Sequence, residues 1–141
     1  MKKILAILIS LTLLLIACAP KDESSKYSQE ELDNLAQCLT ENDVVMYGAF
    51  WCPHCINSKK NFGSAVGYLN YVECDSKCKP DENGKILSAC KGHEGQPELC
   101  LERDIKGYDT WIFADGTRAT GEPALELLDS RSKCNVLPQA E

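Results

Sequence analysis

The chain has 141 residues, of which 44% are hydrophobic and 26% charged, with 15 Lys and Arg against 21 Asp and Glu. This length and composition predict one globular domain and exclude a disordered chain. The formal net charge of −6 lacks the basic surplus of nucleic-acid-binding proteins, so we expect no nucleic acid partner. Nine cysteines exceed what a reducing cytosol usually sustains, and they indicate an exported protein with disulfides, redox chemistry or metal binding.

The N-terminal segment has the layout of an export signal. Two lysines precede an apolar run at 4–16, which is too short to span a bilayer. The run ends in Leu-Ile-Ala-Cys at 15–18, which resembles the lipobox of prokaryotic lipoproteins. That resemblance implies a signal peptide at 1–17 and a lipidated Cys18 that anchors the chain to the membrane outside the cytoplasm. An ordinary secretory signal, cleaved near Ala17 or Ala19, is the alternative.

The rest of the chain divides by composition into three parts. Residues 18–27 are polar and lack an apolar period, so we expect a tether behind the lipidated Cys18. Residues 28–134 hold the periodic segments and are expected to form the domain, and residues 135–141 are expected to be a C-terminal tail. The tether would keep the domain close to a membrane surface.

Hydrophobic periodicity and turn residues predict the elements of the domain in chain order. A capping box at Ser28 and Glu31 opens an amphipathic helix at about 29–40. A buried strand at 44–50, a helix from 53 to about 66 and a strand at 68–73 follow. An irregular loop is expected at 74–96. After it we expect a short helix at 97–103, a hairpin of strands at 110–114 and 117–120, and a last helix at 123–128.

This order of elements predicts an α/β domain. Helices and strands alternate and the chain ends in a hairpin, which implies a central mixed sheet of about four strands flanked by helices on both faces. The loop at 74–96 is interpreted as a cysteine-rich insertion into that framework.

The sequence Trp51-Cys52-Pro53-His54-Cys55 lies where the first strand should pass into a helix. A helix N-terminus has free N–H groups and a partial positive charge, both of which stabilise a thiolate. The spacing predicts that Cys52 is the exposed, attacking thiol and that Cys55, one turn further on, is the buried, resolving thiol. Pro53 suits the first helical turn, and His54 can add positive charge beside Cys52.

These residues resemble the active site of the thioredoxin superfamily, with the Pro-His pair of DsbA-type oxidases. The string from Met46 to Cys55 is closer still to the thioredoxin-like domains associated with bacterial and archaeal vitamin K epoxide reductase homologues. Segments 71–74, 97–100 and 105–108 also resemble those domains, so the resemblance covers about residues 30–130. It implies a thioredoxin-like fold, thiol–disulfide exchange with cysteines of exported proteins, and a quinone-linked membrane redox partner of the vitamin K epoxide reductase or DsbB type.

Two positions depart from the family pattern. The family usually has a cis-proline before the strand at 110, where substrate peptides pair, and this chain has Asp109. A cis bond before a residue other than proline costs about 2.5–4 kcal/mol, so we expect a trans bond between Tyr108 and Asp109. Together with Trp51, these two residues are the expected substrate-binding residues. The second departure is Met46, which stands where many thioredoxins bury an acid and which we expect to be a core residue.

Six further cysteines remain, and 15 pairings among them are possible. Cys78 and Cys90 flank the apparent insertion, Cys74 and Cys100 bracket the whole loop, and Cys38 and Cys134 are left by elimination. We expect these three pairs to be structural disulfides, each contributing on the order of 3–5 kcal/mol. The alternative is that one pair relays electrons between the Cys52–Cys55 pair and a partner.

The expected function is therefore a membrane-tethered thiol–disulfide oxidoreductase outside the cytoplasm, acting as an oxidase of exported proteins and needing no cofactor. A disulfide reductase is one alternative. Another is a metal-binding module or metallochaperone, with copper held by Cys52, Cys55 and Asp109. A further interpretation is a zinc ribbon, with zinc held by Cys52, Cys55, Cys74 and Cys78. The last is an inert interaction domain stabilised by disulfides. We assign no metal ligands.

Overall fold

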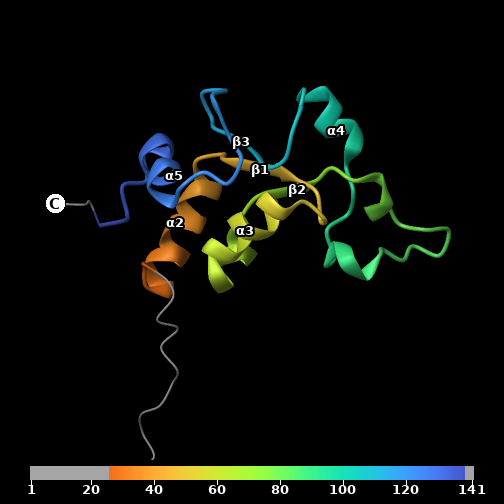
Figure 1. Ribbon diagram of the computed structural model, residues 1–141, viewed down its shortest axis with the longest axis horizontal. Coiled ribbons are helices and arrows are strands. Elements are labelled where there is room, and N and C mark those ends of the chain that lie inside the picture. Colours follow the sequence, from red (N-terminus) through yellow and green to blue (C-terminus); the bar gives the residue numbers. More distant parts are fainter. Residues whose placement is uncertain (1–25, 139–141) are drawn as a thin grey trace, which may run out of the picture.

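A computed structural model of the chain describes residues 26–138 (Figure 1). The expected signal peptide at 1–17 and the expected lipidation site at Cys18 lie outside the described residues. The helices and strands, in chain order, are α2 (Gln29–Glu41), β1 (Val45–Gly48), α3 (Pro53–Asn61), β2 (Tyr71–Glu73), α4 (Pro97–Glu102), β3 (Thr110–Ile112), β4 (Arg118–Thr120) and α5 (Leu125–Ser132). Short 3-10 helices lie at Gly63–Tyr68, Ser76–Cys78 and Ser88–Cys90. In residues 26–138, no helix combines the length and the apolar character needed to cross a bilayer.

The four strands form one mixed sheet in the order β2-β1-β3-β4. β1 and β2 are parallel, whereas β3 is antiparallel to both β1 and β4. Because neighbouring residues of a strand point to opposite faces, Met46 joins one core and Tyr47 another. This is the predicted α/β mixed sheet, and with its helices and cysteine-rich loop it is a thioredoxin-like fold.

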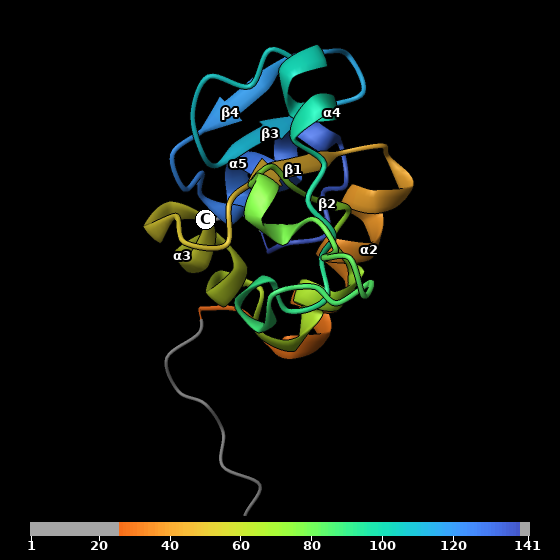
Figure 2. The same ribbon diagram turned by 90° about the vertical axis from the view of Figure 1, so that its right-hand side faces the viewer.

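Helices cover both faces of the sheet. The larger core contains the apolar faces of α2 and α5 together with Phe62 and Trp111, whose rings stack at 6.0 Å. The smaller core lies on the other face, where α4 contributes Cys100 and Leu99. Figure 1 shows α4 and the 74–96 loop at the opposite end of the molecule from α2 and α5, and Figure 2 shows the sheet between α4 and α2. Met46 is fully buried in the larger core, as expected.

The predicted elements all occur, but several bounds differ. The second helix is shorter than expected: α3 ends at Asn61 and the chain continues in a 3-10 helix, because Gly63 takes a positive φ of 55° that an α-helix cannot continue through. The last helix begins and ends later than expected, at 125–132. It ends where Lys133 adopts a left-handed conformation at the C-cap.

The three disulfides join Cys38 to Cys134, Cys74 to Cys100 and Cys78 to Cys90. They join the same cysteines that were paired from the sequence. Cys78–Cys90 closes the irregular loop on itself, and Cys74–Cys100 ties the end of β2 to α4. The loop therefore has covalent support at both its base and its middle.

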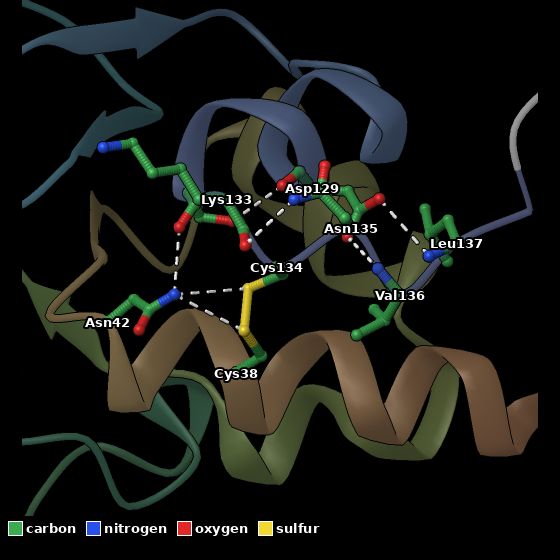
Figure 3. Close-up of a disulfide and its surroundings, with 9 residues drawn as sticks. Cys38, Asn42, Asp129, Lys133, Cys134, Asn135, Val136 and Leu137 are labelled. Carbon is green, nitrogen blue, oxygen red and sulfur yellow. Dashed lines mark hydrogen bonds between the residues drawn. A yellow bond between two sulfur atoms is a disulfide. The ribbon is translucent and has the colours of Figure 1, made fainter.

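The ends of the domain extend further than the sequence indicated. Tyr27, placed in the tether, is buried in the larger core and donates a hydrogen bond to Glu126 at 2.5 Å. Leu137, placed in the tail, is also buried there. Asp129 holds this segment: its buried carboxylate accepts hydrogen bonds from the backbone N–H groups of Val136 and Leu137 (Figure 3). A buried carboxylate needs such donors, so the segment after α5 is part of the domain.

Candidate active site

The Cys-Pro-His-Cys sequence lies at the junction of β1 and α3. Cys52 is the N-cap residue of α3, Pro53 is the first helical residue, and Cys55 is one turn inside the helix. Pro53 lacks an N–H group, which costs nothing at a position where that group would have no partner within the helix. Both cysteines are free thiols. The junction therefore carries the predicted dithiol at a helix N-terminus.

The expected exposure of Cys52 is wrong. Its exposed fraction is 4%, compared with 0% for Cys55. The Cys52 thiol turns away from solvent toward the loop before β3, where it donates to the carbonyl oxygen of Tyr108 at 3.5 Å. The sequence placed Cys52 correctly at the helix start, but the cover over its sulfur comes from a segment more than 50 residues further on.

The bond between Tyr108 and Asp109 is cis, contrary to the expectation of a trans bond. That expectation counted only the intrinsic preference of the peptide bond. In the fold, Asp109 is held from several sides: its carbonyl accepts from Gly121 N at 3.1 Å, and its carboxylate accepts three further hydrogen bonds. The Tyr108 carbonyl faces Cys52.

The carboxylate of Asp109 is directed into the protein. It is fully buried and accepts hydrogen bonds from Ser58 Oγ at 2.5 Å, Trp111 Nε1 at 2.9 Å and Glu122 N at 2.7 Å. These donors belong to α3, β3 and the segment after β4. Asp109 therefore ties three parts of the fold together behind the dithiol, and its side chain is not available to contact a substrate from solvent.

Trp51 and Tyr108 form an aromatic border beside Cys52. Their rings meet edge to face with centroids 6.1 Å apart, and Trp51 is 54% exposed. The indole N–H of Trp51 donates to Asp75 Oδ2 at 2.5 Å, which fixes the orientation of the ring. The exposed apolar ring is thus held in place next to the thiol pair and offers a contact surface to a partner.

His54 projects from the first turn of α3 into solvent. Its Nδ1 lies 3.6 Å from Glu122 Oε2, and the same carboxylate oxygen accepts from Asn57 Nδ2 at 3.2 Å. The sequence did not identify Glu122 as a neighbour of the site. A positive charge on His54 would be partly offset by the Glu122 carboxylate. Glu122 therefore weakens the stabilisation that His54 can give to a thiolate at Cys52.

Burial raises the pKa of the Cys55 thiol to about 12, and the hydrogen bond to Cys52 and the charge of Asp109 act in the same direction. The thiolate of Cys55 would be held in an apolar environment, which disfavours charge. At neutral pH Cys55 is therefore a protonated thiol that needs a proton acceptor before it can attack a disulfide.

Gly48 and Ser58 also shape the site, although no motif in the sequence pointed to them. A Cβ atom at Gly48 would lie 2.6 Å from Cys55 Sγ, so only glycine leaves room for this sulfur. A glycine inside a strand often marks such a close approach, and that signal was present in the sequence. Ser58 is one turn beyond Cys55, but its bond to Asp109 depends on tertiary contact.

The residues proposed for metal binding are not brought together. Cys74 and Cys78 are both in disulfides, which contradicts the zinc ribbon. The carboxylate of Asp109 already accepts three hydrogen bonds, which leaves it poorly disposed toward copper beside the cysteines. Within residues 26–138 no cluster of three or more His, Cys, Asp or Glu side chains has the geometry of a metal site.

The fold and the site together define a thioredoxin-like domain with a buried dithiol at a helix N-terminus. No known family model matches the chain. Over 99 residues, the chain is 38% identical to a protein of Arabidopsis thaliana named "Thiol-disulfide oxidoreductase LTO1". The aligned region covers 67% of this chain but 23% of the plant protein, so the chain corresponds to about a quarter of that relative. The chain is therefore a homologue of part of a thiol-disulfide oxidoreductase.

Proposed function

We propose that this protein is a thiol–disulfide oxidoreductase that uses Cys52 and Cys55. The observation that carries the proposal is the division of its cysteines. Among the described residues, six cysteines are paired in disulfides and only Cys52 and Cys55 are free. Cys52 lies at the N-cap of α3, and a helix N-terminus stabilises a thiolate. The similarity to part of a plant thiol-disulfide oxidoreductase supports the same activity.

Exchange proceeds by attack of a thiolate on a disulfide sulfur. In the reducing direction, Cys52 attacks a substrate disulfide, its sulfur bonds to one substrate sulfur, and the other substrate sulfur leaves as a thiolate. Cys55 then attacks Cys52, which releases the second substrate thiolate and forms the Cys52–Cys55 disulfide. In the oxidising direction the same steps run in reverse.

The border of Trp51 and Tyr108 is the proposed substrate-binding surface. Trp51 is exposed and fixed by Asp75, and the Tyr108 carbonyl lies against Cys52. Asp109 acts behind this surface as a positioning residue, since its carboxylate is buried and fully engaged with Ser58 and its other donors.

We propose net oxidation of exported proteins as the direction. The support is the Pro53-His54 pair, which resembles that of DsbA-type oxidases, and the helix N-terminus, because a stabilised thiolate makes the disulfide form more oxidising. The Glu122 carboxylate beside His54 opposes this stabilisation of the thiolate and so favours a less oxidising disulfide. A reductase is the competing outcome.

The location and partners follow from the N-terminal sequence and the resemblance. A lipidated Cys18 would hold the domain on the outer side of the cytoplasmic membrane, and a polar segment of a few residues would separate it from Tyr27, where the domain begins. A quinone-linked membrane protein of the vitamin K epoxide reductase or DsbB type would then reoxidise the Cys52–Cys55 pair.

The test of activity and direction is the reduction potential of the Cys52–Cys55 pair. The full chain with Cys18→Ser is equilibrated in glutathione buffers, and the dithiol fraction is counted by alkylation and mass spectrometry. An oxidase is expected to lie near the DsbA value of about −120 mV, and a reductase near the thioredoxin value of about −270 mV. Cys55→Ala lacks the resolving thiol, so its Cys52 should be trapped in a mixed disulfide when the variant is incubated with an unfolded protein that carries a disulfide. A pair that exchanges with neither glutathione nor protein contradicts the proposed activity.

The test of the anchor is separate. Expressed in a bacterial host with labelled palmitate, the wild-type chain should incorporate label and sediment with membranes, and Cys18→Ala should do neither. Label-free secretion of the wild-type chain would instead indicate an ordinary signal cleaved near Ala17 or Ala19.

A further inference from the structure

Cys55 shares a cavity with a group of polar and charged side chains, of which Glu73 is buried, Lys59 partly buried and His93 exposed. The cavity has a volume of about 460 Å³, and its lining includes Cys55, Lys59, Glu73 and His93. Exposed side chains such as Ile56 also line it, so water reaches its interior. The lining is mainly apolar, but its polar groups offer hydrogen-bond partners to water in a cavity of this size.

Tyr71 connects this cavity to the dithiol. A Cβ atom at Gly48 would lie 2.6 Å from Cys55 Sγ and 3.1 Å from Tyr71 Cε2. The Cys55 sulfur and the Tyr71 ring therefore both approach the Gly48 backbone closely. Lys59 Nζ lies 3.2 Å from the centroid of this ring, and the His93 ring meets it edge to face at 4.9 Å.

Glu73 is the carboxylate of this group, and it is almost completely buried, with an exposed fraction of 1%. One carboxylate oxygen accepts from Tyr71 Oη at 2.7 Å, and the other accepts from Asp75 N at 2.9 Å. β2 pairs with β1 so that Glu73 lies opposite Gly48, the residue that makes room for Cys55. Each oxygen keeps a further lone pair that can take a proton.

We propose that the Glu73 carboxylate is the proton acceptor for Cys55 in thiol–disulfide exchange, with Tyr71 holding it in position and water in the shared cavity carrying the proton. This inference rests on the proposed function and assigns a residue that the sequence analysis left unassigned. In the resolving step the proton of Cys55 passes to Glu73, and the Cys55 thiolate attacks Cys52. The bond from Cys52 to the substrate breaks, the Cys52–Cys55 bond forms, and the substrate leaves as a thiolate. In the oxidising direction Glu73 returns the proton to Cys55.

Asp109 is the other buried carboxylate near Cys55, and its contacts make it a poorer acceptor. Its carboxylate already accepts from Ser58, Trp111 and Glu122, and Asp109 does not line the cavity. The other groups around Cys55 are Cys52, Tyr71 on β2, and Lys59, next to which lie Glu73, Lys91 and His93. Lys59 is attracted by Glu73, and its positive charge stabilises the Cys55 thiolate as it forms.

The test separates the two chemical steps by pH. In the full chain with Cys18→Ser, Cys52 is loaded with glutathione, and release of glutathione by Cys55 is followed between pH 6 and pH 10. Glu73→Gln keeps the shape of the side chain and is expected to slow glutathione release at least tenfold at pH 7. The difference in rate between the wild type and the variant should shrink as pH rises, because hydroxide then takes the proton of Cys55 in place of the carboxylate. Tyr71→Phe is expected to slow release by a smaller factor.

Two controls make the outcome specific. Glu94→Gln, an exposed carboxyl-to-amide change in the neighbouring loop, should leave the pH profile unchanged. In a Cys55→Ala background, the rate of Cys52 alkylation should be the same with and without the Glu73→Gln change, which would show that the first thiol and the fold are intact.

The proposal is overturned if Glu73→Gln and Tyr71→Phe both release glutathione with the wild-type pH profile, or if Asp109→Asn alone moves that profile. Failure of the proposed function has a different signature: the wild-type chain would take up glutathione at Cys52 and not release it, or would take up none.

Discussion

The hydroxyl of Ser58 and the carboxylate of Asp109 are hydrogen-bonded at 2.5 Å in the interior of the protein. This bond joins α3, which begins at Cys52, to the loop whose Tyr108 carbonyl accepts from the Cys52 thiol. The two segments are far apart in the chain, so the position of Cys52 against Tyr108 depends on contacts of this kind. Asp109 therefore has a structural role that its place in the family pattern did not reveal.

Replacing Asp109 with alanine should destabilise the protein strongly. The change removes the acceptor of Ser58 Oγ, Trp111 Nε1 and Glu122 N, and each buried donor left without a partner costs about 1–3 kcal/mol. We expect a loss of about 3 kcal/mol or more in the free energy of unfolding, measured by guanidinium titration. Glu102→Ala, at an exposed position, is the control, and a shared unfolding midpoint for the two variants would refute the assigned role.

Gly48→Ala should disturb the dithiol directly. The new Cβ would lie 2.6 Å from Cys55 Sγ, so the sulfur or the helix must move. Overpacking of this kind costs about 1–3 kcal/mol, and we expect that loss in unfolding experiments together with slower glutathione release by Cys55. Gly67→Ala is the matched control because a Cβ there meets no atom within 4 Å. Equal effects of the two changes would contradict the close approach of Gly48 and Cys55.

The stability of the reduced protein should fall in alkaline solution. The pKa of Cys55 is raised from 9.0 to about 12 in the folded protein, mainly by burial. Between these values the folded state keeps a proton that the unfolded state has lost, so the free energy of unfolding decreases as pH rises from about 9 toward 12. The measurement is urea unfolding of the reduced protein, compared with the oxidised protein at each pH.

The oxidised form is the control for this prediction because its Cys55 cannot titrate, whereas tyrosines with raised pKa values, such as Tyr71 and Tyr108, titrate in both forms. The difference between the two curves should therefore grow above pH 9, and the alkaline loss of stability should be smaller in Cys55→Ser than in the reduced wild-type protein. Parallel curves for the two wild-type forms would show that Cys55 is not buried as a protonated thiol.

Removing the Cys38–Cys134 disulfide should cost on the order of 4 kcal/mol. The bridge spans 96 residues and fastens α2 to the segment after α5, so it restricts the unfolded chain over most of the domain. Asn42 supports it, since Asn42 Nδ2 donates to Ser132 O at 2.9 Å and contacts both sulfurs (Figure 3). The double change Cys38→Ala and Cys134→Ala is tested by guanidinium unfolding without reductant. Asn42→Ala should cost about 1 kcal/mol. If the double change lowered the free energy of unfolding by less than Asn42→Ala does, the role of the bridge would be contradicted.

Local patterns in the sequence were sufficient for the order of the elements. The capping box at Ser28 and Glu31, the apolar run before Trp51 and the Asp115-Gly116 turn each describe chemistry within a few residues, and each element occurs in the fold. The bounds were less well predicted. Gly63 and Lys133 end helices through their backbone conformation, which periodicity does not report.

The amino-acid sequence by itself determined the mixed α/β fold and the position of the dithiol at a helix start, because those features depend on spacing along the chain. Only the tertiary structure decided that Cys52 is covered by Tyr108, that the Tyr108–Asp109 bond is cis, and that Glu73 shares a cavity with Cys55. These features arise between segments that are distant in the chain, where burial and hydrogen bonding outweigh the intrinsic preferences of single residues.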